Sequence, residues 1–339
     1  MSELRLNVLT NEWVILAPVR SQRPSDLCRA HPRPARVAHD PGCPFCPGNE
    51  QRSVETARVP DGAGGWRTRV VLNRFPALTR DAPGSGAVGE EVRGLRVRAD
   101  AYGAHEVFVD TPRHDDVTAL MSVAELTGVL ESYRARYRVM AADPRLAHVV
   151  IFKNHGAAAG ASLAHPHSQL IASPVASRQV LDRMALFARH LRDHGGCLAC
   201  AVLADELRDG ARVLHAGRGF VALTPWAALS PFHTWILPRR HLRNFGDIAA
   251  DELVDLASTL RRVLRMLHFG LGDPDFNYVI RSGPLRGGGV DYHWYLSIVP
   301  RVGERAGFEF GSGMYINPTW PDDTAAFLRA VALPPDDAA

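Results

Sequence analysis

Two histidines separated by a single proline, in the stretch LAHPHSQLIA (residues 163–172), have the spacing that most directly indicates chemistry. They follow GAAAGAS, whose small residues let the backbone approach a ligand and turn its N–H groups toward phosphate oxygens. In an extended segment residues i and i+2 point the same way, so His165, His167 and Gln169 share one face. One imidazole could then attack phosphorus, while the amide of Gln169 or the hydroxyl of Ser162 stabilises the charge that develops. The alternative is a pair of hydrophilic loop histidines.

Four of the five cysteines form two C-x-x-C pairs, CPFC and CLAC, at Cys43, Cys46, Cys197 and Cys200. In a reducing compartment such pairs indicate metal or redox chemistry rather than structural disulfides. The first pair stands in a Pro/Gly-rich knuckle, which favours a metal over a thioredoxin-like motif. A closed tetrahedral zinc site needs two further ligands, and His114 and His165 are the candidates for the first pair. Cys28 has no evident partner.

These residues must be positioned by a small set of strands and helices. Short β-branched runs predict strands over 12–18, 68–73, 105–111, 148–154, 219–225, 233–239, 277–282 and 293–301, with a further strand after the H-P-H segment. Helical periodicity predicts helices over 122–143 and 249–272, and a largely helical connection over 176–196. Segments 21–66 and 80–92 are rich in Pro, Gly and Arg and are expected to be loops.

The order of elements is similar in the two halves of the chain. Each half has an upstream C-x-x-C, a strand pair, a helix, a strand, and a histidine close to a later strand. This pattern predicts a duplicated α+β unit, with halves at 1–180 and 190–339.

Composition and charge exclude several classes of protein. The chain of 339 residues carries a formal net charge of +3, and its arginines are scattered, so a nucleic-acid surface is not expected. The N-terminus does not resemble a signal peptide, and no run reaches about 18 apolar residues, the length of a membrane span. We therefore expect a cytoplasmic protein that binds neither nucleic acid nor membrane.

Together these motifs resemble the galactose-1-phosphate uridylyltransferase family, the nucleotidyltransferase branch of the histidine-triad superfamily. LTNEWVILAPVRSQRP resembles its opening segment, CPFCPGNE its metal knuckle, VVLNRFPAL its base- and ribose-binding segment, and KNHGAAAGASLAHPHSQ its active-site loop. The resemblance implies two histidine-triad-like halves forming a curved, mostly antiparallel sheet flanked by helices, and a homodimer with sites near the subunit interface.

The resemblance also assigns roles to individual residues. It makes His167, the second His of H-P-H, the nucleophile, supported by Gln169 and Ser162. Nucleotide and phosphates would be bound by Arg20, Arg23, Asn73, Phe75, Asn154, Gly160, Ser162 and Gln169. The first zinc ion would be held by Cys43, Cys46, His114 and His165. The implied reaction is ping-pong: a nucleoside diphosphate sugar transfers its nucleotidyl group to His167, and a sugar 1-phosphate or phosphate accepts it.

Departures from the family pattern leave the substrate open. Phe308 and Glu309 stand where contacts to the sugar are expected. Family members that work on galactose also have a short helix containing Glu-Thr-Gln-Arg-Asp and a second H-x-H, and this sequence lacks both. CLAC, HWYLSIVP and GFEFGSGMYINP resemble the ADP-glucose phosphorylase side branch, which would place a second zinc ion on Cys197, Cys200, His241 and His293. His233 could compete with His241. The H-P-H motif itself favours the uridylyltransferases over that side branch.

The leading interpretation is uridylyl transfer to a hexose 1-phosphate, and the closest rival is adenylyl transfer from ADP-glucose to phosphate. Another biosynthetic sugar 1-phosphate and a dinucleoside polyphosphate phosphorylase are further candidates. Interpretations of a different class are a zinc-stabilised nucleotide-binding protein whose catalysis has lapsed, and a redox role for the C-x-x-C pairs.

Overall fold

The computed structural model describes residues 1–18, 37–81, 90–286, 291–303 and 306–335. Arg20, Arg23 and Cys28 lie outside the described residues.

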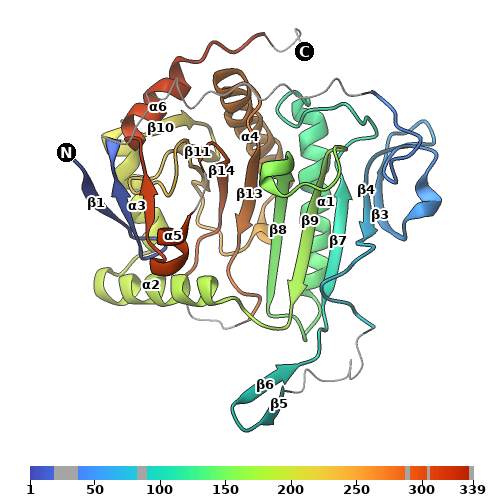
Figure 1. Ribbon diagram of the computed structural model, residues 1–339, viewed down its shortest axis with the longest axis horizontal. Helices are drawn as coiled ribbons and strands as arrows, with labels where there is room; N and C mark the ends of the chain where they lie inside the picture. Colours follow the sequence, from blue (N-terminus) through green and yellow to red (C-terminus); the bar gives the residue numbers. More distant parts are fainter. Residues whose placement is uncertain (19–36, 82–89, 287–290, 304–305, 336–339) are drawn as a thin grey trace.

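A ten-stranded sheet runs through the centre of the molecule (Figure 1), and every neighbouring pair in it is antiparallel. Its order is β10 (Val213–Ala216), β11 (Phe220–Leu223), β12 (Thr234–Pro238), β14 (Tyr295–Pro300), β13 (Phe276–Arg281), β8 (His148–His155), β9 (His167–Ser173), β7 (Ala104–Val109), β4 (Trp66–Leu72) and β3 (Glu55–Pro60). Outward from the central β8–β13 pair, the two halves repeat one strand order, as two copies of one unit would. The residue ranges of the two halves stay a prediction.

Two long helices lie side by side against one face of the sheet, α1 (Val123–Ala141) behind the first half and α4 (Ala250–Leu271) behind the second (Figure 1). Helix α1 begins at Ser122, whose hydroxyl accepts from the Glu125 N–H while the Glu125 carboxylate accepts from the Ser122 N–H. This capping box satisfies two backbone donors that the first turn would otherwise leave unpaired. The apolar sides of both helices and the sheet residues facing them, such as Leu170 and Leu296, form the main core.

The second half of the sheet is covered on its other face as well. Helices α2 (Arg178–His194) and α3 (Leu198–Asp209) pack there through a second apolar cluster that includes Phe187, Leu203, Trp235 and Tyr295. Cys197 is the N-cap residue of α3, so the second C-x-x-C pair stands at the beginning of a helix.

The N-terminal hairpin and a strand from the C-terminal segment pair beside the second half of the sheet (Figure 1). The hairpin of β1 (Glu3–Asn7) and β2 (Glu12–Leu16) pairs in parallel with β15 (Tyr315–Asn317), which follows α5 (Gly307–Ser312) and precedes α6 (Pro321–Ala330).

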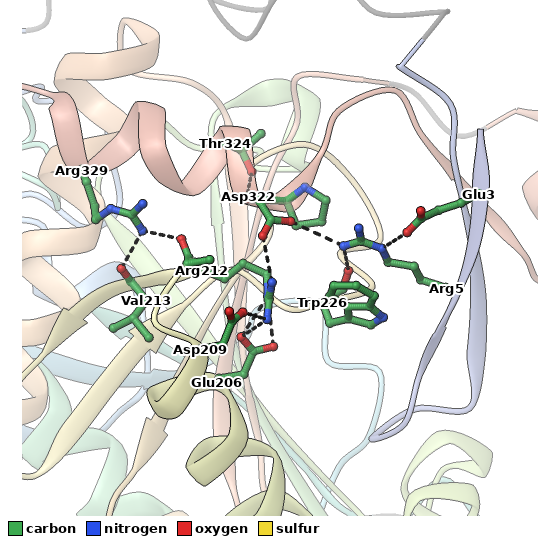
Figure 2. A network of polar contacts seen from close by, with 12 residues as sticks. Glu3, Arg5, Glu206, Asp209, Arg212, Val213, Trp226, Asp322, Thr324 and Arg329 are labelled. Atoms are coloured by element: carbon green, nitrogen blue, oxygen red, sulfur yellow. Dashed lines mark hydrogen bonds and ion pairs between the residues drawn. The ribbon is translucent and has the colours of Figure 1, made fainter. Parts of the chain in front are cut away.

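A polar network ties these ends to α3 (Figure 2). The buried Arg212 guanidinium donates to Glu206 Oε2 at 2.9 Å, to Asp209 Oδ2 at 2.5 Å and to Asp322 Oδ1 at 2.9 Å. Arg5 on β1 lies 3.6 Å from the other oxygen of Asp322. The buried Arg212 therefore connects α3 to α6, and Asp322 on α6 connects in turn to Arg5 of the N-terminal hairpin.

The predicted α+β class, with a mostly antiparallel sheet flanked by helices, is confirmed. The prediction of loops over 21–66 and 80–92 is wrong in part, because β3 and the 3-10 turn Glu50–Arg52 lie in the first segment and β5 (Glu90–Arg93), paired with β6 (Arg96–Ala99), begins in the second. These elements are short and mostly polar, so they give little of the apolar alternation that predicts a strand. The remaining 3-10 turns are η4 (Ala157–Ala159) and η5 (Phe245–Asp247).

No helix in the described ranges is both long and apolar enough to cross a membrane.

Candidate active site and metal centres

His167 opens β9 on the face of the sheet opposite α1. Ser168, Leu170 and Ala172 alternate with it and face the other way, where Leu170 and Ala172 join the core under α1. Gln169 lies on the same face as His167, as the i, i+2 spacing predicts.

A hydrogen bond fixes which nitrogen of His167 carries the proton. Nδ1 lies 2.8 Å from the backbone oxygen of His165, and a carbonyl oxygen can only accept, so Nδ1 is the protonated nitrogen. Nε2 of the neutral ring then holds a lone pair. Burial lowers the pKa of His167; the bond to the His165 carbonyl opposes this shift and the Lys153 ammonium adds to it. The ring is therefore neutral near pH 7, with Nε2 unprotonated.

The small-residue loop is shaped by two glycines in the left-handed region. Gly156 has φ +85° and Gly160 has φ +87°, and a Cβ on Gly156 would lie 1.8 Å from Asp275 Oδ1. Asp275 Oδ2 also accepts from the N–H of Ala158 at 2.7 Å. The loop can approach the second half of the chain this closely only because position 156 has no side chain. Ser162, at the end of the loop, is exposed.

Asn154 is held by a residue from the second half. Asn277 Nδ2 donates to Asn154 Oδ1 at 2.8 Å and to the Ala159 carbonyl at 2.8 Å. Asn277 Oδ1 in turn accepts from Arg301 Nε at 2.6 Å. The central β8–β13 pairing thus positions both an expected phosphate-binding amide and the loop beside it.

Three further side chains lie at the Gln169 end of this face. Asn73 Nδ2 is 3.5 Å from Gln169 Oε1, and His105 Nε2 is 2.8 Å from the same oxygen. Phe75 follows Asn73 with 82% of its surface exposed, and its N–H donates to Asn73 Oδ1. The structure therefore brings Asn73 to Gln169 and leaves the Phe75 ring open to a ligand.

A buried ion pair lies on the α1 side of the sheet, behind His167. Lys153 Nζ is 2.5 Å from Asp110 Oδ2 and 3.0 Å from the backbone oxygen of His167, and both charged side chains are 1% exposed. Lys153 is the only lysine in the sequence. The ammonium therefore fixes the backbone that carries His167.

The ion pair continues into a buried chain of hydroxyl groups. Ser168 Oγ donates to Asp110, with both carboxylate oxygens at 3.1 Å, and accepts from Tyr133 on α1 at 2.5 Å. The hydroxyls of Tyr133 and Tyr278 lie 2.6 Å apart. Charges and hydroxyls in this low-dielectric layer satisfy one another, which holds the start of β9 in a single position.

The first cysteine pair meets two histidines at a buried cluster. Nδ1 of His165 lies 3.8 Å from Cys43 Sγ and 3.6 Å from Cys46 Sγ, and Nδ1 of His114 lies 3.5 Å from Cys46 Sγ. Regular tetrahedral zinc bonds would separate nitrogen and sulfur ligands by about 3.6 Å. His165 Nε2 donates to the Thr111 carbonyl at 2.8 Å, which turns Nδ1 toward the cluster. These nitrogen–sulfur distances fit a tetrahedral zinc ion.

The second cluster repeats this chemistry. Nδ1 of His293 lies 3.9 Å from Cys197 Sγ and 3.3 Å from Cys200 Sγ, and Nδ1 of His241 lies 3.6 Å from Cys200 Sγ. The other ring nitrogens lie 3.1 Å from the Pro238 carbonyl and 2.6 Å from Asp291 Oδ1, as is usual for histidines that bind metal. In each cluster, all four ligand atoms lie within 4.8 Å of one another.

The two clusters differ in the residue that stands two positions after the later histidine. After His165 this residue is His167, whereas after His293 it is Tyr295, which is 1% exposed. His233 does not join the second cluster; its Nε2 lies 2.9 Å from Ser297 Oγ and accepts from Trp235 Nε1. Of these two equivalent positions, only the one in the first half carries an imidazole.

The candidate sugar-binding residues do not lie beside His167. Phe308 and Glu309 lie on α5, which stands beside β15 over the second half of the sheet (Figure 1). The Glu309 carboxylate accepts from the Ala306 N–H at 2.9 Å and so caps its own helix.

Comparisons with known proteins identify the relatives of this chain. Residues 1–176 match the family model described as galactose-1-phosphate uridyl transferase, N-terminal domain. An ADP-glucose phosphorylase of Arabidopsis thaliana is 34% identical over 335 residues, which cover 98% of this chain and 93% of that protein. A galactose-1-phosphate uridylyltransferase of Thermotoga maritima is 27% identical over 339 residues, covering 97% of this chain and 98% of that protein. The crystal structure of an Arabidopsis thaliana ADP-glucose phosphorylase with bound ADP-glucose matches with a TM-score of 0.84 and 33% identity, over 98% of this chain and all of that one.

The site and these relatives define an enzyme of the nucleotidyltransferase class. Within that class, the chain belongs to the galactose-1-phosphate uridylyltransferase family, matched by the family model over more than half its length.

Sequence reasoning missed several residues of this site. Lys153, His105 and Asn277 each contact a candidate residue or its backbone from another strand, and Asp110, which follows β7, pairs with Lys153. The isolation of Lys153 as the single lysine is the one signal in the sequence that could have drawn attention to it.

Proposed function

We propose that the chain transfers a nucleotidyl group through a covalent bond to Nε2 of His167. The observation that carries this proposal is the hydrogen bond from His167 Nδ1 to the His165 carbonyl, 2.8 Å long. It leaves Nε2 with a lone pair, on the face that also carries Gln169 and Asn154. A neutral imidazole held in one tautomer is prepared to attack phosphorus.

The first half-reaction forms one bond and breaks one. Nε2 of His167 attacks the α-phosphorus of a nucleoside diphosphate sugar, the P–N bond forms, and the bond to the bridging oxygen breaks with its electron pair leaving on sugar 1-phosphate. Because Nδ1 keeps its proton, the nucleotidyl imidazole is positively charged and the His165 carbonyl stabilises that charge. Gln169, Ser162 and the loop N–H groups offer donors to the equatorial phosphate oxygens.

The second half-reaction reverses the displacement with a different nucleophile. An oxygen of the acceptor phosphate attacks the nucleotidyl phosphorus, the P–N bond breaks, and its electron pair returns to Nε2. His167 is then neutral again, with its proton still on Nδ1. Two displacements at one phosphorus replace a single direct transfer between two anions.

We propose zinc as the metal of both Cys2His2 clusters. The Cys43, Cys46, His114 and His165 set would anchor the segment that carries His167, two residues from a ligand. All four ligands of each cluster are taken from the chain, so the ion has a structural role. The homodimer and the cytoplasmic location expected from the sequence stay predictions, as do the roles of Arg20, Arg23, Phe308 and Glu309.

For the substrate we favour ADP-glucose as donor and phosphate as acceptor. The chain has 34% identity to an ADP-glucose phosphorylase along almost its full length, against 27% for the Thermotoga maritima uridylyltransferase. The second Cys2His2 cluster, which the sequence resemblance connects with that branch, supports the same choice. Uridylyl transfer to a hexose 1-phosphate is the second candidate, and the His165-Pro166-His167 motif favours it.

Product analysis separates the two. The enzyme is incubated with ADP-glucose and phosphate, and in parallel with UDP-glucose and galactose 1-phosphate, and products are resolved by ion-exchange chromatography. We expect ADP and glucose 1-phosphate from the first mixture. Faster formation of UDP-galactose from the second would replace our choice with the uridylyltransferase. No product from either, with nucleotide binding retained, would identify a binding protein whose catalysis has lapsed.

A further inference from the structure

His105 lies on the face of the sheet opposite α1, next to the side-chain amide of Gln169. Strand β7 pairs with β9 in a register that places His105 opposite Ile171 and Val107 opposite Gln169. His105 and Gln169 are therefore diagonal neighbours on one face, within reach of long side chains. The half-buried His105 is neither a metal ligand nor part of the proposed covalent step.

The hydrogen bonds of His105 fix its tautomer. The backbone N–H of Ala77 lies 3.2 Å from His105 Nδ1, and an N–H can only donate, so Nδ1 is an acceptor without a proton. The neutral ring then carries its proton on Nε2. That nitrogen lies 2.8 Å from Gln169 Oε1, a carbonyl oxygen that accepts the bond.

A second donor points at the same oxygen. Asn73 Oδ1 accepts from the Phe75 N–H at 2.9 Å, which turns the NH2 group of Asn73 toward His105 Nε2, 3.0 Å away, and Gln169 Oε1, 3.5 Å away. Because Nε2 carries the proton, this NH2 group can donate only to Gln169 Oε1. Reversing the Gln169 amide would place its own NH2 against the N–H of His105 and the NH2 of Asn73. Each of these donors would then lose its acceptor, which is unfavourable where water does not replace the bond.

We propose that His105 is a positioning residue that holds the Gln169 amide in the orientation needed for nucleotidyl transfer. With Oε1 turned toward β7, the NH2 group of Gln169 faces away from His105 and can donate to a phosphate oxygen as charge develops on it. This role rests on the proposed function, because it acts only through an amide that stabilises the transition state at His167.

The test compares a variant that removes the donor with one that keeps it. In His105→Phe the ring stays and the N–H is lost, whereas His105→Gln places an amide N–H close to the position of Nε2. Single-turnover formation of the nucleotidyl enzyme is measured with ADP-glucose and with UDP-glucose, together with donor affinity. Loss of a donor to a transition-state oxyanion costs about 100- to 1000-fold in rate. Loss of its orientation alone should cost part of this, about 10- to 100-fold for His105→Phe, with donor affinity changed less than about threefold and His105→Gln close to the wild-type rate.

A double-mutant cycle separates positioning from a general structural role. In a Gln169→Leu background, His105→Phe should lower the rate by less than about twofold further, because the amide on which it acts is gone. An equal fold loss in both backgrounds, or equal losses for the Phe and Gln variants, would overturn the proposal. His190→Phe on α2 is the matched His-to-Phe control, and zinc content and circular dichroism report folding. The same loss of rate is expected for His105→Ala, so the proposal can still be tested if the Phe variant does not fold.

The outcome for wild-type protein distinguishes the two levels of inference. If wild-type protein forms a nucleotidyl adduct and the cycle shows no coupling, the role of His105 is wrong and the proposed function stands. If wild-type protein forms no adduct with either donor, the proposed function fails and the role of His105 fails with it.

Discussion

Replacing the single lysine tests the buried network that holds His167. Lys153→Met keeps the length of the side chain but removes the ammonium that lies 2.5 Å from Asp110 Oδ2 and 3.0 Å from the His167 carbonyl. Asp110 then keeps its hydroxyl donor from Ser168 but has lost its cation in a layer where both partners are 1% exposed. Breaking a buried pair by removing one partner costs about 3–5 kcal/mol, since it leaves an uncompensated charge.

A second substitution separates the unpaired charge from lost packing. Asp110→Asn in the Lys153→Met background removes the carboxylate that has lost its cation. We expect this second substitution to recover about half of the lost free energy of unfolding. Lys153→Arg is the matched control: it keeps the charge, but its planar fork does not fit a site built for a compact ammonium, so a smaller loss of about 1–3 kcal/mol is expected.

Urea unfolding of zinc-loaded protein, monitored by fluorescence, measures these differences from the midpoint and slope of each transition. A loss below about 1 kcal/mol for Lys153→Met, or no recovery in the double variant, would refute the view that this pair is an integral part of the core.

Three further outcomes are expected. Zinc analysis should find two ions per chain, and Cys200→Ser should reduce this to one, since Cys200 belongs to the less buried cluster; an unchanged zinc content would contradict the assignment. Burial, with the nearby charge of Arg281, lowers the pKa of His148 to about 4, so between pH 6.5 and 4 the unfolded chain binds a proton that the folded chain does not. The protein should therefore become less stable as the pH is lowered through this window. Between pH 7 and pH 5, His148→Gln should lose about 2 kcal/mol less free energy of unfolding than wild type does. Parallel curves of stability against pH for the two proteins would be inconsistent with this pKa shift. Arg212→Met should lower the free energy of unfolding by about 3 kcal/mol, because it leaves the buried Glu206 carboxylate without its cation. A change within about 0.5 kcal/mol would show that the network adds little to stability.

Local patterns were sufficient for the elements that lie deepest. The helices at 122–143 and 249–272 and the strands around them were predictable because their apolar periodicity reflects burial against one sheet. The i, i+2 spacing placed His167 and Gln169 on one face for the same reason, since alternation is a property of any extended segment.

Contacts between strands could not be predicted in this way. The bonds from Lys153 to Asp110 and from His105 to Gln169 depend on the order β8-β9-β7 and on its register, which no single segment specifies. The position of α5 relative to the His167 face likewise depends on how the chain ends pair beside β2, so Phe308 and Glu309 could be selected by motif but not placed.

The central claim is that His167 carries the nucleotidyl group, and intact-protein mass spectrometry with subsequent peptide mapping tests it most directly. Wild-type protein and His167→Gly are each incubated with ADP-glucose and with UDP-glucose in the absence of an acceptor. We predict an adduct of one nucleoside monophosphate on the wild-type chain, mapped to the His167 imidazole and absent from the variant, with AMP the preferred group. An adduct that persists in His167→Gly, or none on the wild-type chain from either donor, would contradict the covalent mechanism.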